Sequence, residues 1–256
     1  MTLNDFGTLC HDRGQLTKAL RLFSEAMEIN ERLGYATSVT VNRNNIGMVL
    51  RQLGRFEAAR GHLMQALSAN RKSGSPDVLA SLDELSQLHA HLGEHSQALN
   101  AAREALVLAR SSHDPRAEAA VLGTLGDALL AVGRVDEARE CFRDAEGIAT
   151  KCSYAFYAIR ARIGLARADL AAGLVESAET IAAQATAAAK AQGYTSLESE
   201  GLLAMARIQL ALHNPDRTMQ LCHEILRLPG GEETYQAAIT RRLLETALEP
   251  AGTPPN

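Results

Sequence analysis

Apolar residues along this chain follow helical spacing in pairs of segments, and a glycine divides each pair. The dividing glycines stand 40, 39, 40 and 40 residues apart, at Gly14, Gly54, Gly93, Gly133 and Gly173. Glycine has no Cβ, so it adopts the left-handed backbone conformation that ends a helix. Each unit is therefore predicted to be two amphipathic helices joined by a tight turn. His213-Asn214 stand at the turn position of a sixth unit.

Small residues hold fixed places around every turn. They stand seven positions before it, five after it and twelve after it, with few exceptions. The three series are Gly7, Gly47, Ser86, Gly126, Ala166 and Ala206; Ala19, Ala59, Ala98, Ala138, Ala178 and Thr218; and Ala26, Ala66, Ala105, Ala145, Ala185 and Ile225. We expect small residues where two helices cross, because they let the backbones approach. A fixed period of this length indicates a solenoid, in which each unit buries its apolar face against its neighbours.

The boundaries between units carry capping signals. Ser75-Pro76-Asp77 and Asp114-Pro115 each place a capping side chain before a proline at the first helical position. Asn214-Pro215-Asp216 does the same for the second helix of the sixth unit. Glycines end the second helices of three units, at Gly34, Gly74 and Gly193. No segment shows the alternation of a strand, so an all-α fold is predicted.

The two ends of the chain differ. Only thirteen residues precede Gly14, so the opening helix is predicted to be short; the chain is then either a piece of a longer protein or carries a minimal cap. Near the other end, apolar positions from Tyr235 to Ala247 predict one more helix that caps the solenoid. We predict a single domain over 1–249 and a flexible tail at 250–256. Its units are about 1–34, 35–74, 75–113, 114–153, 154–193 and 194–230, with the capping helix at 232–249.

The spacing of the small residues around each turn resembles the tetratricopeptide repeat (TPR) over about residues 1–228. A large apolar residue also precedes the first small position of each unit, at Phe6, Ile46, Leu85, Leu125, Leu165 and Met205. The position nine after the turn holds an aromatic residue in two units, Phe23 and Phe142. Units longer than the usual TPR resemble those of kinesin light chains, Pins-type polarity proteins and bacterial regulators of the SARP and STAND types. Sequence segments such as "LGRFEAARGHLMQAL" are most similar to those of the actinobacterial regulators.

The resemblance implies a right-handed superhelical solenoid of about six TPR helix pairs plus a C-terminal capping helix. In such a fold the first helix of each unit lines a concave groove, which binds a peptide, a partner protein or a small effector. Counting back from each turn places ten candidate residues in this groove. They are Asn44, Asn45, Met48, Arg51, Asp83, Gln87, Asp127, Arg160, Arg167 and Arg207.

Two sets among these candidates have alternative interpretations. Asn44-Asn45 resembles the asparagine pair with which longer TPRs hold a peptide backbone, or it is a solvated pair on a concave surface. Arg167 and Arg207 occupy the same position in successive units, where guanidinium groups can clamp a carboxylate or phosphate. Alternatively, these arginines pair inside the groove with Asp127 or Asp169. Acidic residues gather in the earlier units and arginines in the later ones, which favours a bipolar groove.

Composition and charge limit the classes of partner. The net charge of −4 gives no overall attraction to nucleic acid or to an anionic membrane, so we expect neither as a direct partner. No apolar run is long enough to span a bilayer, and the N-terminus lacks the features of a signal peptide. The four cysteines, Cys10, Cys141, Cys152 and Cys222, are scattered, as expected of reduced thiols in a cytoplasmic protein.

No motif for catalysis or for a cofactor is present. His89 and His91 fall on different faces of a helix, and Gly93 separates them from His95, so a metal site is not predicted. The sequence contains no GxxxxGK[ST], GxGxxG or HExxH. We therefore predict no catalytic residue, no metal and no cofactor, and an enzyme with a helical-repeat body is the weakest hypothesis.

Two functions remain. The first is a binding module that serves as the sensor or interaction domain of a larger bacterial transcriptional regulator, as the resemblance implies. The second is a freestanding scaffold for complex assembly that associates with itself through its terminal helices.

Overall fold

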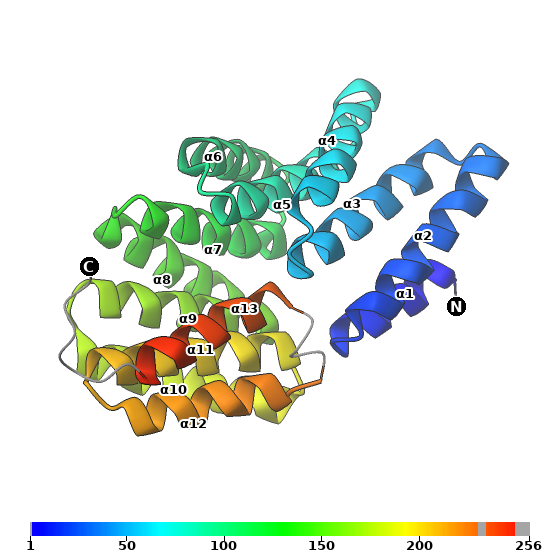
Figure 1. Cartoon of the computed structure of the whole chain (residues 1–256). Coiled ribbons are helices and arrows are strands. Elements are labelled where there is room, and N and C mark those ends of the chain that lie inside the picture. The colour runs from blue at the N-terminus through cyan, green and yellow to red at the C-terminus, as the bar shows by residue number, and fades with distance from the viewer. Residues whose placement is uncertain (1, 230–233, 249–256) are drawn as a thin grey trace.

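The computed structural model describes residues 2–229 and 234–248, and all regular structure in these ranges is α-helical (Figure 1). This confirms the predicted all-α solenoid. The described helices are α1 (Leu3–Asp12), α2 (Leu16–Leu33), α3 (Ala36–Gln52), α4 (Phe56–Ser73), α5 (Val78–His91), α6 (His95–Ser111), α7 (Pro115–Ala131), α8 (Val135–Lys151), α9 (Ala155–Ala171), α10 (Val175–Gln192), α11 (Thr195–Ala211), α12 (Pro215–Arg227) and α13 (Tyr235–Leu248).

Helices α1 to α12 form six successive antiparallel pairs, and α13 packs on α11 and α12. Helix α1 is the shortest at 10 residues, and a capping box between Thr2 and Asp5 starts it. The predicted tail at 250–256, the predicted end of the sixth unit at 230 and both ends of the predicted capping range 232–249 lie outside the described residues.

The turn between the helices of each pair requires a positive φ. The five dividing glycines have φ values between 72° and 77°, and His213 takes the same place in the sixth unit with φ 55°. A second left-handed position follows the second helix of each of the first five units. Gly34, Gly74 and Gly193 occupy this position as predicted. In the third and fourth units it is occupied by His113 and Ser153, whose residue types do not indicate a left-handed backbone.

Two of the three predicted caps form as expected. The Asp114 side chain accepts hydrogen bonds from the backbone N–H groups of Arg116 and Ala117, and that of Asn214 accepts one from Arg217. At the third, the prediction of a helix starting near Pro76 was wrong by two residues. The Ser75 hydroxyl accepts a hydrogen bond from the backbone N–H of Asp77, so the chain makes a further turn before α5 begins at Val78.

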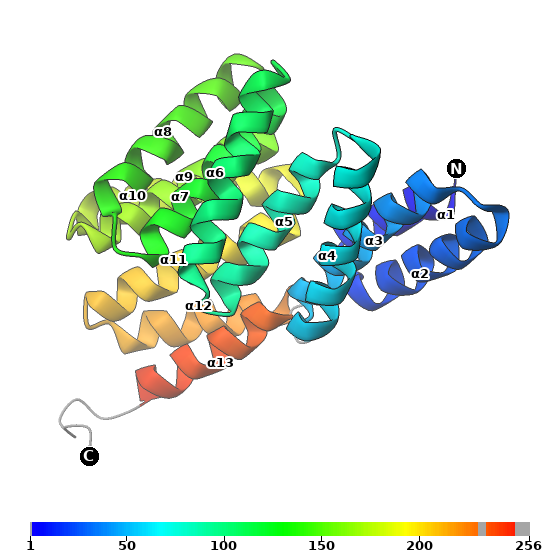
Figure 2. The same ribbon diagram turned by 90° about the horizontal axis from the view of Figure 1, so that it is seen from above.

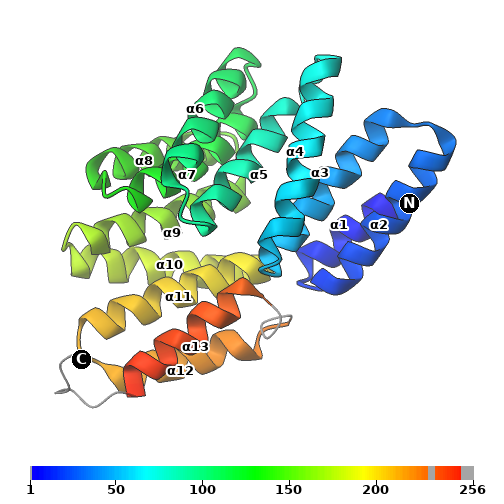
Figure 3. The same ribbon diagram turned by 45° about the horizontal axis from the view of Figure 1, so that its top comes forward.

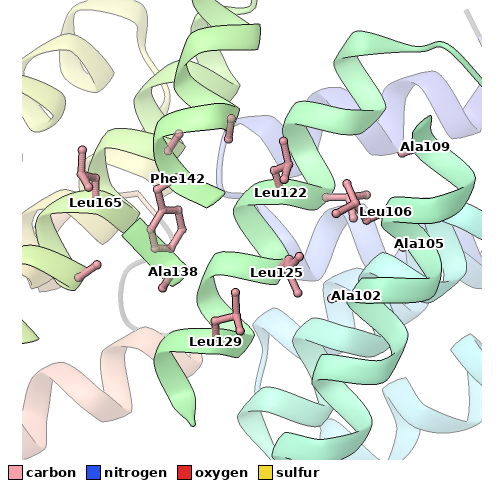
Figure 4. Close-up of a cluster of buried hydrophobic side chains, with 14 of the residues drawn as sticks. Ala102, Ala105, Leu106, Ala109, Leu122, Leu125, Leu129, Ala138, Phe142 and Leu165 are labelled. Carbon is pink, nitrogen blue, oxygen red and sulfur yellow. The ribbon is translucent and has the colours of Figure 1, made fainter. Parts of the chain in front are cut away.

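Large and small residues fit one another across each helix pair. A Cβ on Gly7 would come within 2.6 Å of the Phe23 ring, and one on Gly126 within 2.7 Å of the Phe142 ring. Phe142 also fills the space above Gly164 of the next unit, so one aromatic ring joins three helices (Figure 4). Where the position nine after the turn holds Ala or Cys, the position seven before it holds Ser or Ala. The close packing of the core therefore depends on matched pairs.

The odd-numbered and even-numbered helices form two layers. Successive odd-numbered helices from α3 to α11 contact one another, whereas no comparable contact joins successive even-numbered helices among the described residues. The stack therefore curves, with the odd-numbered helices on its concave side and the even-numbered helices on its outer side (Figures 1 and 2).

The curved stack closes on itself through α13, whose first residue lies beside the α3–α4 turn (Figures 2 and 3). The Tyr235 ring lies 4.9 Å from the ring of Phe56 and 4.9 Å from that of His91, between centroids. We call these three side chains the closing cluster. A second contact lies nearby, because a Cβ on Gly14 would come within 2.7 Å of the Pro229 carbonyl oxygen.

Candidate ligand-binding site

Charged side chains from five successive odd-numbered helices gather on the concave side. We call them the inner charge cluster: Arg51 of α3, Asp83 and Glu84 of α5, Asp127 of α7, Arg160 and Arg167 of α9, and Glu200 and Arg207 of α11. On α9 and on α11 the two members are seven positions apart, close to two helical turns, so both lie on one helix face. The curvature of the stack brings these faces together.

One part of the cluster is paired. Arg51 is buried, and its Nε and Nη2 donate to Glu84 Oε2 at 3.2 and 3.0 Å. Arg167 Nη1 donates to Asp127 Oδ1 at 2.9 Å, while Arg160 Nη2 lies 3.5 Å from Asp127 Oδ2. Arg160 and Arg167 thus share one carboxylate, in agreement with the interpretation that the groove arginines pair with Asp127.

Asp169, the other acid considered as a partner for the groove arginines, is used elsewhere. Its Oδ1 accepts from Arg139 Nε at 2.7 Å and its Oδ2 from the Ser177 hydroxyl at 2.6 Å. Both partners belong to the even-numbered helices α8 and α10. Asp169 therefore joins the two layers and is not part of the inner charge cluster.

Two groups of the cluster, on Glu200 and Arg207, are left without a direct partner among the described residues, and a third, on Asp83, is only partly satisfied. The buried Asp83 Oδ1 makes no hydrogen bond of good geometry, but burial, which raises the pKa of this carboxyl, is opposed by an interaction with the Thr124 side chain, and Asp83 Oδ2 accepts from Gln87 Nε2 at 3.1 Å. Neither the Glu200 carboxylate nor the Arg207 guanidinium makes a hydrogen bond or an ion pair with a described residue. Glu200 and Arg207 are half-buried. An unpaired charge that is partly withdrawn from water is unfavourable, so these groups are features of the concave face that packing does not explain.

The electrostatic environment shifts the pKa values of these groups in the expected directions. Burial raises the pKa of Asp83 to about 6, against the opposing effect of Arg160. Burial also raises the pKa of Glu200, and it lowers that of Arg207, with a further lowering by Arg167. Each shift disfavours the charged form, so a ligand of opposite charge would relieve it.

A pocket of about 270 Å³ opens beside Arg167 and Arg207, between α7, α9 and α11. Asp127, Arg167 and Arg207 are the charged residues of its wall. The remaining wall is aliphatic and consists of Leu130, Ala131, Ala166, Leu170, Ala204 and Ile208. A concave site with an apolar wall and a few convergent charges is the usual form of a small-ligand site.

The two predicted asparagines lie between units. Asn44 is buried, and its Oδ1 accepts from the Ser81 hydroxyl at 3.0 Å. Asn45 Nδ2 donates to Asn4 Oδ1 of the first unit at 2.9 Å. Their side chains thus connect neighbouring units, and a contact with a peptide backbone remains a prediction only for the half-buried Asn45.

The remaining predicted residues divide between packing and the cluster. Met48 packs against the apolar core around Ile46, and Gln87 donates to Asp83. Arg51, Asp83, Asp127, Arg160, Arg167 and Arg207 come together as the inner charge cluster. Counting back from the turn also places Glu84 in the groove beside Asp83, whereas Glu200 was not a candidate. Glu200 could have been found from the repeat, since it stands forty residues after Arg160 in the same position of its unit.

The histidines and cysteines have other surroundings. His89 Nδ1 lies 2.5 Å from Glu94 Oε2, and His91 stacks within the closing cluster. Burial raises the pKa of the Cys141 thiol to about 11. Within 2–229 and 234–248, no three His, Cys, Asp or Glu side chains are grouped so that they could hold a metal ion. In the same ranges, no helix has the length and apolar character needed to cross a bilayer.

Comparison with known proteins identifies the family of this chain and solved structures with a similar fold. A family model described as the MalT-like TPR region matches residues 2–251. No curated protein matches the chain. A solved STAND protein with a tetratricopeptide repeat sensor, from Pyrococcus horikoshii, is 17% identical with a TM-score of 0.60, and the match covers 96% of this chain and 38% of that one.

Two further solved structures share the fold. A Rap protein complexed with Competence and Sporulation Factor is 16% identical with a TM-score of 0.69, and the match covers 96% of this chain and 73% of that one. A thermophilic TPR protein from Thermus thermophilus is 20% identical with a TM-score of 0.61, over 82% of this chain and 98% of that one. At these identities the likeness concerns the fold alone.

Proposed function

Because the chain belongs to the MalT-like TPR family, we propose that it is a binding module that holds a peptide, a segment of a partner protein or a small effector on its concave face. In this proposal the chain binds its ligand and does not catalyse a reaction on it. The ligand contacts the inner charge cluster and enters the pocket beside Arg167 and Arg207.

One observation carries this proposal: the concave face holds the Glu200 carboxylate and the Arg207 guanidinium without a direct partner among the described residues. Packing alone would favour apolar residues at these positions, because an uncompensated inner charge destabilises the folded chain. Charges that a ligand completes give affinity and specificity in return.

We further infer that the module is the sensor or interaction domain of a larger bacterial transcriptional regulator that acts in the cytoplasm. The solved STAND protein, which has a TPR sensor, supports this placement, and this chain spans 38% of its length. The gene sequence upstream of Met1 tests it. A regulator requires a DNA-binding domain or a nucleotide-binding P-loop in the same reading frame, and a complete reading frame without either contradicts it.

The alternative, a self-associating scaffold, uses the terminal helices as its interface. Helix α13 already packs on α11 and α12 of the same chain, and its first residue belongs to the closing cluster. Because these contacts occupy α13 within one chain, they do not favour the scaffold. Light scattering separates the two proposals: a scaffold gives a stable oligomer at micromolar concentration, and a binding module of this kind gives a monomer.

A display library of random short peptides tests the binding module directly. Wild-type protein should enrich related sequences, and the double variant Arg167→Glu, Arg207→Glu should not. Arg134→Glu, which changes an exposed arginine at the start of α8, is the matched control and should enrich the same sequences as the wild type. Enrichment that survives the double reversal contradicts the proposal, provided that circular dichroism shows all three proteins folded.

A further inference from the structure

We propose that the closing cluster is a latch: the curved stack opens and closes at this seam while its helices stay folded, and the open form admits a ligand to the concave face. The latch regulates the site of the proposed function and in that sense rests on it, but its test needs no ligand. Four features of the seam support it: a preformed receiving surface, a small extent, a position beside the inner charge cluster and a dependence on one glycine.

The two sides of the seam come from distant parts of the chain. Phe56 of the second unit and His91 of the third stack on each other, with ring centroids 5.6 Å apart and planes 27° apart. Tyr235, the first residue of α13, packs its ring against both, at 4.9 Å from each. When the seam opens, the Phe56–His91 pair stays intact and only the two contacts of Tyr235 are lost. The receiving surface is therefore preformed, and one side chain completes it.

The seam is small enough to open reversibly. Helix α13 packs most extensively on α12 and least on α3. An aromatic pair favours a contact by about two- to tenfold, so the two pairs of Tyr235 favour the closed form by about tenfold. In the closed form His91 Nδ1 is buried and has no hydrogen bond to a described residue, which reduces this advantage. A superhelix can open through small rotations shared among its unit interfaces, so no helix pair has to separate.

The seam also lies beside both ends of the inner charge cluster. Burial lowers the pKa of His91, and Arg51 and Arg167 lower it further. Burial and Arg167 lower the pKa of Arg207, and Tyr235 opposes this effect. Arg51 belongs to α3 and Arg207 to α11, the first and last helices of the cluster. Closing the seam therefore brings the two ends of the cluster toward each other, and opening it separates them.

A second contact of the seam depends on a glycine. A Cβ on Gly14 would lie 2.7 Å from the Pro229 carbonyl oxygen, which is closer than a Cβ can approach, so the seam cannot close over a side chain at this position. Gly133 has nearly the same φ, 75° against 72°, and a Cβ there would meet nothing within 4 Å. The two glycines make the same conformational demand, but only Gly14 is in contact with the seam.

The accessibility of a thiol on the concave face measures opening directly. Glu200→Cys supplies this thiol in every protein that is compared, and the exposed Cys152 at the end of α8 supplies a reference thiol in the outer layer. Each protein is treated with N-ethylmaleimide and with a maleimide that carries a polyethylene glycol chain, and mass spectrometry follows both thiols. The bulky-to-small ratio of reaction rates at position 200, relative to that at Cys152, reports the open fraction.

Two variants should open the seam. Tyr235→Ala should raise this ratio about tenfold, because two aromatic pairs are lost. Gly14→Ala should also raise it, through the clash with Pro229. Their matched controls are Tyr35→Ala, at a tyrosine that is 58% exposed directly before α3, and Gly133→Ala, and both should leave the ratio unchanged. Circular dichroism checks the helical content, and a constant rate with N-ethylmaleimide excludes local unfolding, which would raise both rates.

A disulfide should lock the seam. A Cβ on Gly54 would lie 3.8 Å from the Tyr235 Cβ, which matches the spacing of about 3.8 Å between the Cβ atoms of a disulfide. Gly54→Cys combined with Tyr235→Cys can therefore be compared with itself in two redox states. The oxidised form should react with the bulky reagent at position 200 about tenfold more slowly than the protein with Glu200→Cys alone. The reduced form should react as fast as Tyr235→Ala.

Two outcomes overturn the latch. The same ratio in the oxidised and reduced forms shows that the concave face is reached without opening of the seam. An unchanged ratio in Tyr235→Ala shows that the closing cluster does not hold the stack closed. Neither outcome contradicts the proposed function, which the display library tests separately, because a stack that never opens or never closes can still bind a ligand.

Discussion

The inner and outer surfaces of this solenoid carry the same types of charged residue in different environments. On the outer side, Arg71 pairs with Glu104 at 2.6 Å, and both side chains are about half exposed. On the inner side, Arg51 pairs with Glu84 at 3.0 Å with side chains only 9% and 17% exposed, while Arg207 has no partner among the described residues. Water screens the outer charges whether or not they are paired, so their pairing is uninformative. The Arg51–Glu84 pair lacks most of that screening, and Arg167, Glu200 and Arg207 are half-buried. The inner charges without a partner among the described residues identify the candidate site.

The buried pair and the exposed pair provide the largest test of this difference. Arg51→Met leaves Glu84 enclosed without its partner and should lower the free energy of unfolding by about 3 kcal/mol. Arg71→Met breaks the outer pair with Glu104 and should lower it by less than about 1 kcal/mol. Urea unfolding at neutral pH measures both. Adding Glu84→Gln to Arg51→Met should restore most of the loss, and equal losses for the two single variants would remove the distinction between the layers.

The pH dependence of stability should show the next largest effect, through His91. Burial lowers the pKa of His91 to about 4, with a further lowering by Arg51. The unfolded chain therefore binds more protons than the folded chain between about pH 6.5 and 4, and this contribution to stability is lost as the pH falls through that range. His91→Phe should reduce the fall in melting temperature between pH 7 and 5 by a few degrees.

His95→Phe is the control for this measurement, because its side chain is exposed at the start of α6. It should keep the wild-type slope of melting temperature against pH. A wild-type slope in His91→Phe as well would mean that His91 titrates as freely in the folded chain as in the unfolded one.

An unmatched inner charge should reduce stability, so its removal should increase it. Arg207→Met removes the repulsion with Arg167 and an enclosed guanidinium, and should raise the free energy of unfolding by about 1 kcal/mol. Arg134→Met, which removes an arginine paired with Glu137 in the outer layer, should produce no gain. A loss of stability in Arg207→Met would show that the guanidinium has a structural partner, and would weaken the assignment of this residue to a ligand.

Asp83 should give an effect of opposite sign to that of His91. Its pKa is raised to about 6, so the folded chain binds more protons than the unfolded chain, and the contribution of this group declines as the pH rises from about 4 to 6. Asp83→Asn should therefore gain stability relative to the wild type over this range. Asp136→Asn, at an acid with a side chain 94% exposed, should show no such trend in the same thermal melts.

Much of the fold could be predicted from the sequence because its rules are local and repeated six times. In the Gly7–Phe23 and Gly126–Phe142 contacts, for example, a small residue seven positions before the turn packs against a large residue nine positions after it, so both contacts could be predicted from residue size and spacing. The exceptions are also local: His113 and Ser153 adopt the left-handed conformation where glycine would be the usual residue, so their type does not indicate their backbone.

The site could be predicted only in outline. Counting back from the turns placed Arg160, Arg167 and Asp127 on the same side, and they do meet. It could not separate Asn44, which is used between units, from residues that face the groove, because one position along a helix rotates a side chain by about 100°. Arg207 has no partner among the described residues because of how strongly the stack curves, and the curvature cannot be predicted from the spacing of residues within one unit.

The closing cluster converts the stack of helices from an open array into a closed one. In an open array, each unit depends only on its two neighbours, and the array can lose order unit by unit from either end. Phe56 and Tyr235 stand 179 residues apart in sequence and yet share one contact, which converts a linear series into a cycle. A cycle has no terminal unit at this seam from which fraying can begin, and formation of the seam must wait for long-range closure of the chain. Order in the second unit and order in the last helix therefore rise and fall together.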